Sequence, residues 1–414
     1  MASVPGAYVR PARYDWFTGT GTNGWVAGMA LAAMMATARG MSATVQVLAR
    51  GELGRFSGNG RSEVSRLEDD LRRTMGVEHA LAVNSGTSAL IAALVGAGIG
   101  PGDEVLVPAY TWVSTAAAPL AVGAVPVLVE VDESLTLDPV DLKRKITPNS
   151  RAVIPVHMLN LVCDMDAIMA VAAEHGLVVI EDACQAVGVR YRGRRVGSIG
   201  HAGAFSFNQH KNIRSGEGGA VLTNDRTLFE RAAMYHDVGS YERDGFSAGG
   251  GDLIVGVNLR MPELSAAVLR PQLAALDVQL ARRGRHRRIM ADALWGSRFA
   301  QRGLRLVPHH DQAAAAGLAV AFDDECAAVE LGARRGVQRL ADTGRHLYPN
   351  WRSIHARTPL HPRLDPYAWA EREVDHGPGS CPNTLRILAR SCAVDLAPEL
   401  PTPAFRVLAR RTSA

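Results

Sequence analysis

The chain has 414 residues, 47% hydrophobic and 21% charged, which is ordinary for a soluble globular protein that can bury a sizeable core. A formal charge of +4, without arginines alternating with exposed aromatics, argues against a nucleic-acid-binding protein. The basic run at 282–288 is interpreted as a solvated helix face, with anion or partner binding as the alternative. The apolar stretch at 25–36 is shorter than the roughly 20 residues that a bilayer requires, so no membrane span is expected.

The five cysteines are an odd number without the paired spacing of a metal site, which fits reduced thiols in a cytoplasmic protein. Residues 1–45 are rich in Gly, Ala and Met and are expected to form an N-terminal extension. The rest of the chain is expected to divide into a large domain at 46–290 and a smaller C-terminal domain at 291–414.

The large domain is expected to begin with an amphipathic helix at 61–75 that has Val64, Leu67 and Leu71 on one face. Short apolar runs, typical of buried strands, then alternate with helical segments; they lie at 79–83, 104–108, 125–129, 152–156, 177–180 and 220–223. This alternation indicates an α/β fold with a mostly parallel sheet covered on both faces. A long helix at 262–292 is expected to lead into the second domain, a mixture of short strands and helices.

Lysine is rare in this chain, which has only Lys143, Lys145 and Lys211 among its 45 basic residues. Unlike arginine, lysine can lose its proton and form an imine with an aldehyde. Lys143 and Lys145 lie in a charged, turn-like segment and are interpreted as surface residues. Lys211 stands between an aromatic strand pattern at 205–207 and a glycine-rich turn at 216–219, so it is the catalytic candidate. The alternative is an ordinary surface lysine before a hairpin.

Other residues at predicted strand ends supply what a pyridoxal 5'-phosphate (PLP) site requires besides a lysine. Asp182 ends an apolar strand, where its carboxylate would keep the ring nitrogen protonated; a helix N-cap is the alternative. Trp112 offers a face for stacking on the ring, with core packing as the alternative. Gln185 is placed to donate to the phenolic oxygen. Ligands of parallel sheets bind beyond the carboxyl ends of the strands, and these residues lie there.

A phosphate site is predicted where Gly86, Thr87 and Ser88 open a helix, because free backbone amides and the helix dipole favour an anion there. Ser206, five residues before Lys211, is expected to place its hydroxyl on the same phosphate. Small residues also cap helices in general, and a serine is also ordinary in a strand, so both structural interpretations stay open.

Together these segments resemble the ordered motifs of the sugar aminotransferase family called the DegT/DnrJ/StrS group. The motifs are NSGTSAL, PAYTWVSTA, IEDACQAVG, FSFNQHKNIRSGEGGAVLTND and GVNLRMPELSAAVL, within about residues 50–290. The resemblance implies a PLP enzyme of fold type I, the aspartate aminotransferase type. Such a fold has a large domain with a mostly parallel, seven-stranded type of sheet between helices, and a smaller C-terminal α+β domain. The segment SCPNT at 380–384 is similar to one in the cyclitol and 3-amino-5-hydroxybenzoate synthase branches.

The resemblance also implies roles for single residues. Lys211 would bond the cofactor aldehyde and shuttle protons, Asp182 would pair with the ring nitrogen, and Trp112 would stack on the ring. The remaining contacts within one chain would come from Gln185, Gly86, Thr87, Ser88 and Ser206. Asn258 resembles an asparagine that reaches the phosphate of a neighbouring subunit, which implies a homodimer with shared active sites; a turn residue before Pro262 is the alternative.

The implied reaction moves an amino group from an amino acid, Glu or Gln, to a keto sugar, cyclitol ketone or related carbonyl compound. The expected partners are therefore an amino acid donor and a carbonyl-bearing acceptor, with no metal, nucleic acid or membrane. His210 and Arg214 differ from what family members often carry and indicate a different substrate pocket. Two alternatives stay open: a PLP-dependent dehydratase or aromatase of the 3-amino-5-hydroxybenzoate synthase type, and a non-catalytic PLP-binding partner protein.

Overall fold

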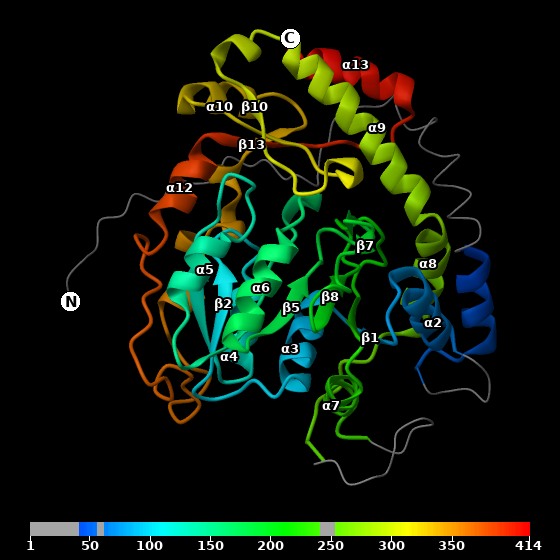
Figure 1. Ribbon diagram of the computed structural model, residues 1–414. Coiled ribbons are helices and arrows are strands. Elements are labelled where there is room, and N and C mark those ends of the chain that lie inside the picture. The colour runs from blue at the N-terminus through cyan, green and yellow to red at the C-terminus, as the bar shows by residue number, and fades with distance from the viewer. Residues whose placement is uncertain (1–40, 56–61, 241–252) are drawn as a thin grey trace.

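The computed structural model describes residues 41–55, 62–240 and 253–414 (Figure 1). Most of the expected N-terminal extension, residues 1–40, lies outside the described residues. Its last five residues, 41–45, begin a helical segment that continues to residue 50.

A seven-stranded sheet is the centre of the larger part of the molecule, in the order β1-β9-β8-β5-β4-β2-β3. Its strands are β1 (His79–Val83), β2 (Glu104–Pro108), β3 (Val125–Val129), β4 (Ser150–Val153), β5 (Val178–Asp182), β8 (Ala202–Ser206) and β9 (Gly219–Thr223). β9 runs antiparallel to both of its neighbours, and the other six strands are parallel to one another. Every residue of β2, β3, β8 and β9 is buried, as expected for strands covered on both faces.

Helices cover the two faces of this sheet and form a separate apolar core on each (Figure 1). One core contains residues of α2 (Glu63–Met75), α5 (Pro139–Lys145), α6 (Met165–His175) and α8 (Glu263–Ala274). The other contains residues of α3 (Gly86–Gly96), α4 (Ser114–Ala121) and α7 (Arg226–His236). Helices therefore cover both faces of the sheet, and the edge at the carboxyl ends of its strands is left as the place for a site.

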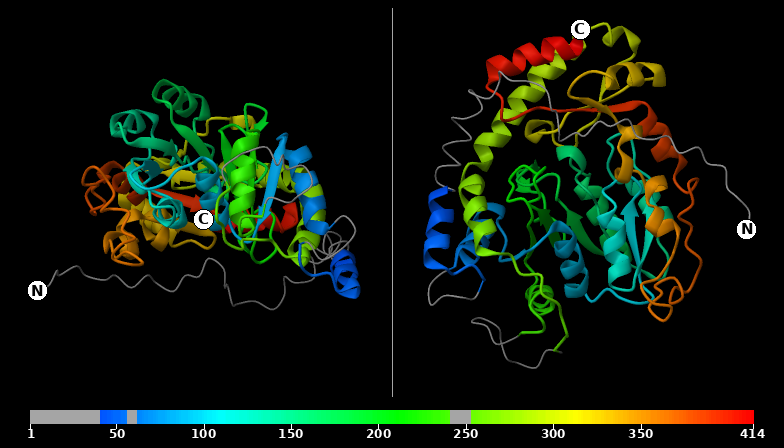
Figure 2. Two further views of the ribbon diagram at one scale, coloured as in Figure 1. Left: turned by 90° about the horizontal axis from the view of Figure 1, so that it is seen from below. Right: turned by 180° about the vertical axis from the view of Figure 1, so that it is seen from behind.

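α9 (Leu276–Trp295) connects the large sheet to a smaller unit at its far end (Figure 2). There a four-stranded antiparallel sheet, in the order β10-β11-β13-β12, packs with α9, α10 (Glu325–Gly332) and α13 (Thr402–Ser413) around a third core. The strands are β10 (Arg305–Leu306), β11 (Ala319–Ala321), β12 (Val337–Arg339) and β13 (Ser391–Val394). Short 3₁₀ turns join them: η2 (Ala300–Arg302), η3 (Gln312–Ala314) and η4 (Leu340–Asp342).

Part of the C-terminal third returns to the large sheet. It comprises η5 (Gly344–His346), η6 (Tyr348–Asn350), α11 (Arg352–His355) and α12 (Pro382–Ala389). Tyr348 and Trp351 are buried in the same core as α3 and α4. Thr384 donates from its backbone N–H and its hydroxyl to the carboxylate of Glu130, at 2.7 and 2.6 Å. The motif SCPNT therefore anchors α12 to the loop that follows β3.

The predicted fold class is confirmed, and so is the amphipathic helix, since Val64, Leu67 and Leu71 are all fully buried on α2. Three details were wrong. The segment around Lys143 is the helix α5, capped by Asp138. The single helix expected at 262–292 is two helices that meet at Ala275. The basic run is more than a solvated face, because Arg283 and Arg287 donate to the carbonyl oxygens of Ala316 and Gly317.

Candidate active site

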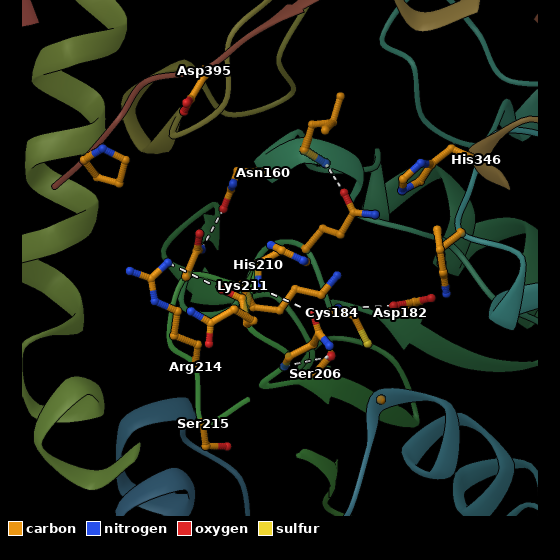
Figure 3. Close-up of a pocket in the computed structure, with 18 of the residues that line it drawn as sticks. Asn160, Asp182, Cys184, Ser206, His210, Lys211, Arg214, Ser215, His346 and Asp395 are labelled. Carbon is orange, nitrogen blue, oxygen red and sulfur yellow. Dashed lines mark hydrogen bonds between the residues drawn. The ribbon is translucent and has the colours of Figure 1, made fainter. Parts of the chain in front are cut away.

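A cleft of about 1620 Å³ opens beyond the carboxyl ends of β5 and β8, between the large sheet and the smaller unit. Seven of the nine predicted site residues line it: Gly86, Thr87, Trp112, Asp182, Gln185, Ser206 and Lys211. Ser88 and Asn258 do not. Figure 3 shows Lys211 at the centre, with Cys184, Ser206 and Asp182 on one side and Asn160 on the other. The two sides of the cleft differ in origin.

Asp182 is the last residue of β5 and is 5% exposed. Its Oδ2 accepts a hydrogen bond from the hydroxyl of Thr115 at 2.8 Å, and its Oδ1 accepts one from the Cys184 N–H at 3.1 Å. The Thr115 hydroxyl in turn lies 2.7 Å from that of Thr111. Two donors thus fix the carboxylate, while no helix begins at this point for it to cap. Burial raises the pKa of the Cys184 thiol well above its usual value, and Asp182 adds to the rise, so this cysteine stays protonated.

The N-terminus of α3 faces the same space. Gly86, its first residue, lies so close to β8 that a Cβ there would meet the Ser206 Cβ at 2.7 Å and the Cys184 sulfur at 3.0 Å. Only glycine fits this approach. The first backbone amides of a helix have no partner within the helix, so those of Gly86 and Thr87 are donors at the cleft surface.

Ser88 has a different position from its two neighbours. Its N–H donates to the hydroxyl of Ser85, the N-cap residue, at 3.1 Å, and its own hydroxyl donates to Asn84 Oδ1 at 2.6 Å. Both groups therefore stabilise the helix start instead of facing the cleft. The hydroxyl of Ser206 lies across from this helix start and accepts a hydrogen bond from the Asn208 N–H at 3.3 Å.

Lys211 lies in the turn that joins β8 to β9. Its N–H donates to the Asn208 carbonyl oxygen at 3.0 Å, and Gly216 and Gly218 adopt positive φ values of 89° and 155° on the return. The turn is tied to α8 by two reciprocal hydrogen bonds: Gln272 Oε1 accepts from the Arg214 N–H at 3.1 Å, and Gln272 Nε2 donates to the Arg214 carbonyl at 2.8 Å. The described chain gives the Lys211 amine neither a hydrogen bond nor an ion pair, whereas Lys143 pairs with Glu174 at 2.8 Å.

Trp112 lines the cleft beside two residues that the sequence did not suggest. The guanidinium carbon of Arg345 lies 4.5 Å from the centroid of the indole, and the His346 ring lies at 5.1 Å, tilted by 58°. The Nδ1 of His346 lies 3.2 Å from the Thr343 carbonyl. Burial lowers the pKa of His346 to about 4, and the nearby Lys211 charge contributes, so the imidazole is neutral at physiological pH.

Gln185 also lines the cleft and is held by a left-handed turn at the end of η1 (Met158–Asn160). Gln185 Oε1 accepts a hydrogen bond from the Leu159 N–H at 3.2 Å, and its backbone carbonyl accepts one from the Asn160 N–H at 3.2 Å. The carboxamide of Asn160 lies 2.7 Å from that of Asn212, the residue after the lysine. The positive φ of Asn160, 62°, is one that asparagine tolerates better than most residues, but this signal in the sequence is weak.

Asn258 is exposed and lies outside the cleft of its own chain. Its Oδ1 accepts a hydrogen bond from the Arg260 N–H at 3.1 Å, and its backbone pairs with Asp237. Arg260 forms an ion pair with Asp237, so it has a structural partner.

Within residues 41–55, 62–240 and 253–414, no cluster of three or more His, Cys, Asp or Glu side chains has the arrangement of a metal site. None of the helices in these ranges combines the length and the apolar character that crossing a bilayer demands.

A family model described as the DegT/DnrJ/EryC1/StrS aminotransferase family matches residues 42–403. The chain belongs to this family. The resemblance that the five motifs carry is thereby confirmed.

Three similar proteins illustrate the range within this family. The dTDP-3-amino-3,4,6-trideoxy-alpha-D-glucose transaminase of Streptomyces venezuelae is 45% identical over 53% of this chain and 57% of its own. The L-glutamine:2-deoxy-scyllo-inosose aminotransferase of Streptoalloteichus tenebrarius is 42% identical over 58% of this chain and 57% of its own. The crystal structure of 3-amino-5-hydroxybenzoic acid synthase has a TM-score of 0.72 at 29% identity, covering 91% of this chain and 95% of that one. The chain thus spans little more than half the length of the curated relatives it matches.

Proposed function

We propose that this protein is a PLP-dependent aminotransferase that moves an amino group from an amino acid to the carbonyl carbon of a keto sugar, a cyclitol ketone or a related compound. The observation that carries the proposal is the position of Lys211. Its amine is without a polar partner in the described chain, and it lies in a cleft between a fixed carboxylate, Asp182, and the N-terminus of α3.

The residues at the cleft fit PLP in charge and shape. The backbone amides of Gly86 and Thr87 and the hydroxyl of Ser206 would hold its phosphate, at a helix start that only glycine permits. Asp182 would hold the protonated ring nitrogen, and Gln185 would donate to the phenolic oxygen. Trp112 would cover the ring. We assign Ser88 to the support of the helix start, because its hydroxyl and N–H are already bonded within the loop.

When bound, PLP supplies an aldehyde for the amino group and an electron-withdrawing ring. Lys211 would bond this aldehyde and, once displaced by the donor, would take the proton from the donor's α-carbon at Nζ and return it in the second half of the cycle. The two hydrogen bonds from Gln272 to the backbone of Arg214 hold the turn that carries Lys211, so the amine meets the substrate in a fixed place.

The replacement of Lys211 by arginine tests the proposal. We expect Lys211→Arg to keep the positive charge and the fold but to lose at least about a thousandfold in turnover, because arginine cannot bond the aldehyde or move the proton. The measurement is the change in cofactor absorbance when the PLP-loaded protein is mixed with glutamate or glutamine, followed by its reversal with a panel of ketones. Lys143→Arg, in an exposed ion pair, is the matched control and should behave as the wild type. Full activity of Lys211→Arg would refute the proposal.

The similarity to the 3-amino-5-hydroxybenzoic acid synthase structure favours a second candidate, a PLP-dependent elimination that gives a dehydrated or aromatic product. The two candidates differ in their need for an amino donor. Formation of a dehydrated product from a cyclic ketone without any donor would select the elimination, whereas strict dependence on a donor selects the transfer.

We also propose a homodimer in which Asn258 reaches the phosphate of the second subunit, since it is exposed and does not line the cleft of its own chain. Mixing Lys211→Arg with Asn258→Ala tests this. Each variant alone should be nearly inactive, and after subunit exchange the mixture should regain about a quarter of wild-type activity, because half of the dimers then have one intact site out of two. No gain, together with a monomeric mass in light scattering, would reject shared sites.

A further inference from the structure

One face of the α8–α9 segment forms a wall of the cleft. The residues on it recur at helical spacing and line the cleft in the order Val268, Gln272, Ala275, Gln279, Arg282 and Arg283. At the α8 end of this face, Gln272 holds the turn that carries Lys211. At the α9 end, Arg283 lines the cleft, so one cation of the basic run lies in the same cleft as the Lys211 amine.

Arg283 is half-buried and has no acidic ion-pair partner among the described residues. Its Nε donates to the Ala316 carbonyl at 3.2 Å, and its Nη2 lies 3.3 Å from the carboxamide of Asn160. By contrast, Arg270 pairs with Glu63 and Asp70 at 2.7 and 2.8 Å. Burial lowers the pKa of Arg283, and the more distant carboxylates of Asp395 and Glu399 oppose this shift.

The guanidinium is also connected to the reactive centre. Asn160, which it faces, lies 2.7 Å from Asn212, and Asn212 directly follows Lys211 in the chain. The N–H of Asn160 donates to the carbonyl of Gln185, the proposed contact of the phenolic oxygen. A group that accepts hydrogen bonds from both Arg283 and Asn160 would therefore lie on the side of the Lys211 turn that faces Gln185, and away from the phosphate site at α3.

We propose that Arg283, with the carboxamide of Asn160 beside it, binds the α-carboxylate of the amino donor. A guanidinium presents several N–H donors in the planar geometry that a carboxylate accepts, and only one of those of Arg283 is used by Ala316. The charge at this end of the cleft fits a single negative group better than a nucleotide diphosphate, because Arg282 and Arg283 share it with Asp395 and Glu399. This inference rests on the proposed aminotransferase function.

The first experiment measures binding without turnover. Glutarate, a dicarboxylate without an amine, is titrated into the PLP-loaded protein in a calorimeter. We expect its dissociation constant to rise about ten- to a hundredfold in Arg283→Gln, the loss typical of a charge-assisted hydrogen bond, and less in Arg283→Lys, which keeps the charge without the planar fork. Arg285→Gln removes the same charge from an exposed position of α9 and should bind glutarate as the wild type does. Equal affinity in Arg283→Gln and the wild type would overturn the proposal.

The second experiment separates the donor from the acceptor. Cofactor conversion is followed with glutamine and with 4-aminobutanamide, the same amine without its α-carboxylate. In the wild type glutamine should react the faster of the two, and in Arg283→Gln only the reaction with glutamine should weaken. A rise confined to the acceptor KM would assign Arg283 to an anionic group of the acceptor and refute the donor assignment. If the wild type converted with no amine at all, the proposed function would fail; if Arg283→Gln converted glutamine as the wild type does, the inference alone would fail.

Discussion

The two sides of the cleft are built in different ways. We call the residues at the strand ends and the start of α3 the cleft floor (Gly86, Thr87, Asp182, Ser206 and Lys211), and those contributed by later elements the cleft wall (Gln272, Arg283, Arg345 and His346). Asp182 and Ser206 end strands of the sheet, Gly86 and Thr87 begin the helix that follows β1, and Lys211 lies in the turn between β8 and β9, so elements of the large sheet fix all five places. The wall residues come from a helix pair and from a 3₁₀ turn, and only packing between distant segments brings them to the floor.

This difference teaches where each property of the proposed transferase would reside. The floor offers the types of group that PLP chemistry requires, and the sheet leaves them little freedom to vary. The wall residues can change without disturbing the sheet, as suits contacts to a substrate. We therefore expect substitutions on the floor to affect chemistry and cofactor affinity, and substitutions on the wall to affect substrate affinity and alignment.

The largest effect, after that of Lys211→Arg, is expected for Asp182→Asn. Asparagine keeps the shape but not the charge, and its amide nitrogen would face one of the two donors, Thr115 Oγ1 or the Cys184 N–H. We expect kcat to fall about a hundred- to a thousandfold. The measurement is the rate of cofactor conversion with glutamine at saturating PLP. Asp138→Asn is the control, since asparagine caps a helix as well as aspartate does at the start of α5. A wild-type kcat in Asp182→Asn would show that catalysis does not require this carboxylate.

The next effect tests the helix start. In Gly86→Ala the added Cβ, 2.7 Å from that of Ser206, must push α3 away from β8 and displace the two amides offered to phosphate. We expect the dissociation constant of PLP to rise about ten- to a hundredfold, as an overpacking strain of 1 to 3 kcal/mol predicts. Gly100→Ala is the control, because its Cβ would meet nothing closer than 3.8 Å. Unchanged PLP affinity in Gly86→Ala would place the phosphate elsewhere.

The sequence could place the floor residues in one region because they lie in short motifs at or near strand ends, where a local pattern and the rules of parallel sheets suffice. Seven of the predicted residues line the cleft, and their roles towards a cofactor stay predictions. The wall was not predictable in this way. Arg283 is one of several arginines in a basic run, and only the approach of the Ala316 loop distinguishes it from the others. His346 looks like any histidine until the chain returns to the large sheet and places it against Trp112.

A smaller effect, about tenfold in kcat/KM, is expected for Gln272→Ala on the wall. This change removes both hydrogen bonds to the backbone of Arg214, so the turn that carries Lys211 loses its tie to α8. A second measurement reports the loosening directly: trypsin should cleave after Lys211 or Arg214 faster than in the wild type. Gln301→Ala, at an exposed position of the smaller unit, serves as the control. If neither kinetics nor cleavage changed, the floor alone would hold the turn.

The smallest effect concerns stability and comes from His309, which is 7% exposed and whose Nδ1 accepts a hydrogen bond from the Asp311 N–H at 3.1 Å. Burial lowers its pKa from 6.5 to about 4. Because the folded pKa is below the unfolded one, the unfolded chain takes up the proton first. The contribution of His309 is therefore complete above about pH 6.5 and is lost as the pH falls towards 4, by about 2 kcal/mol between pH 7 and 5. We expect the drop in Tm between these pH values to be about 2 to 4 °C smaller in His309→Asn than in the wild type.

His175→Asn, at an exposed position of α6, should show the wild-type drop. Equal drops in all three proteins would mean that water reaches the surroundings of His309, unlike those of the buried floor residues. Burial would then not lower the pKa of His309.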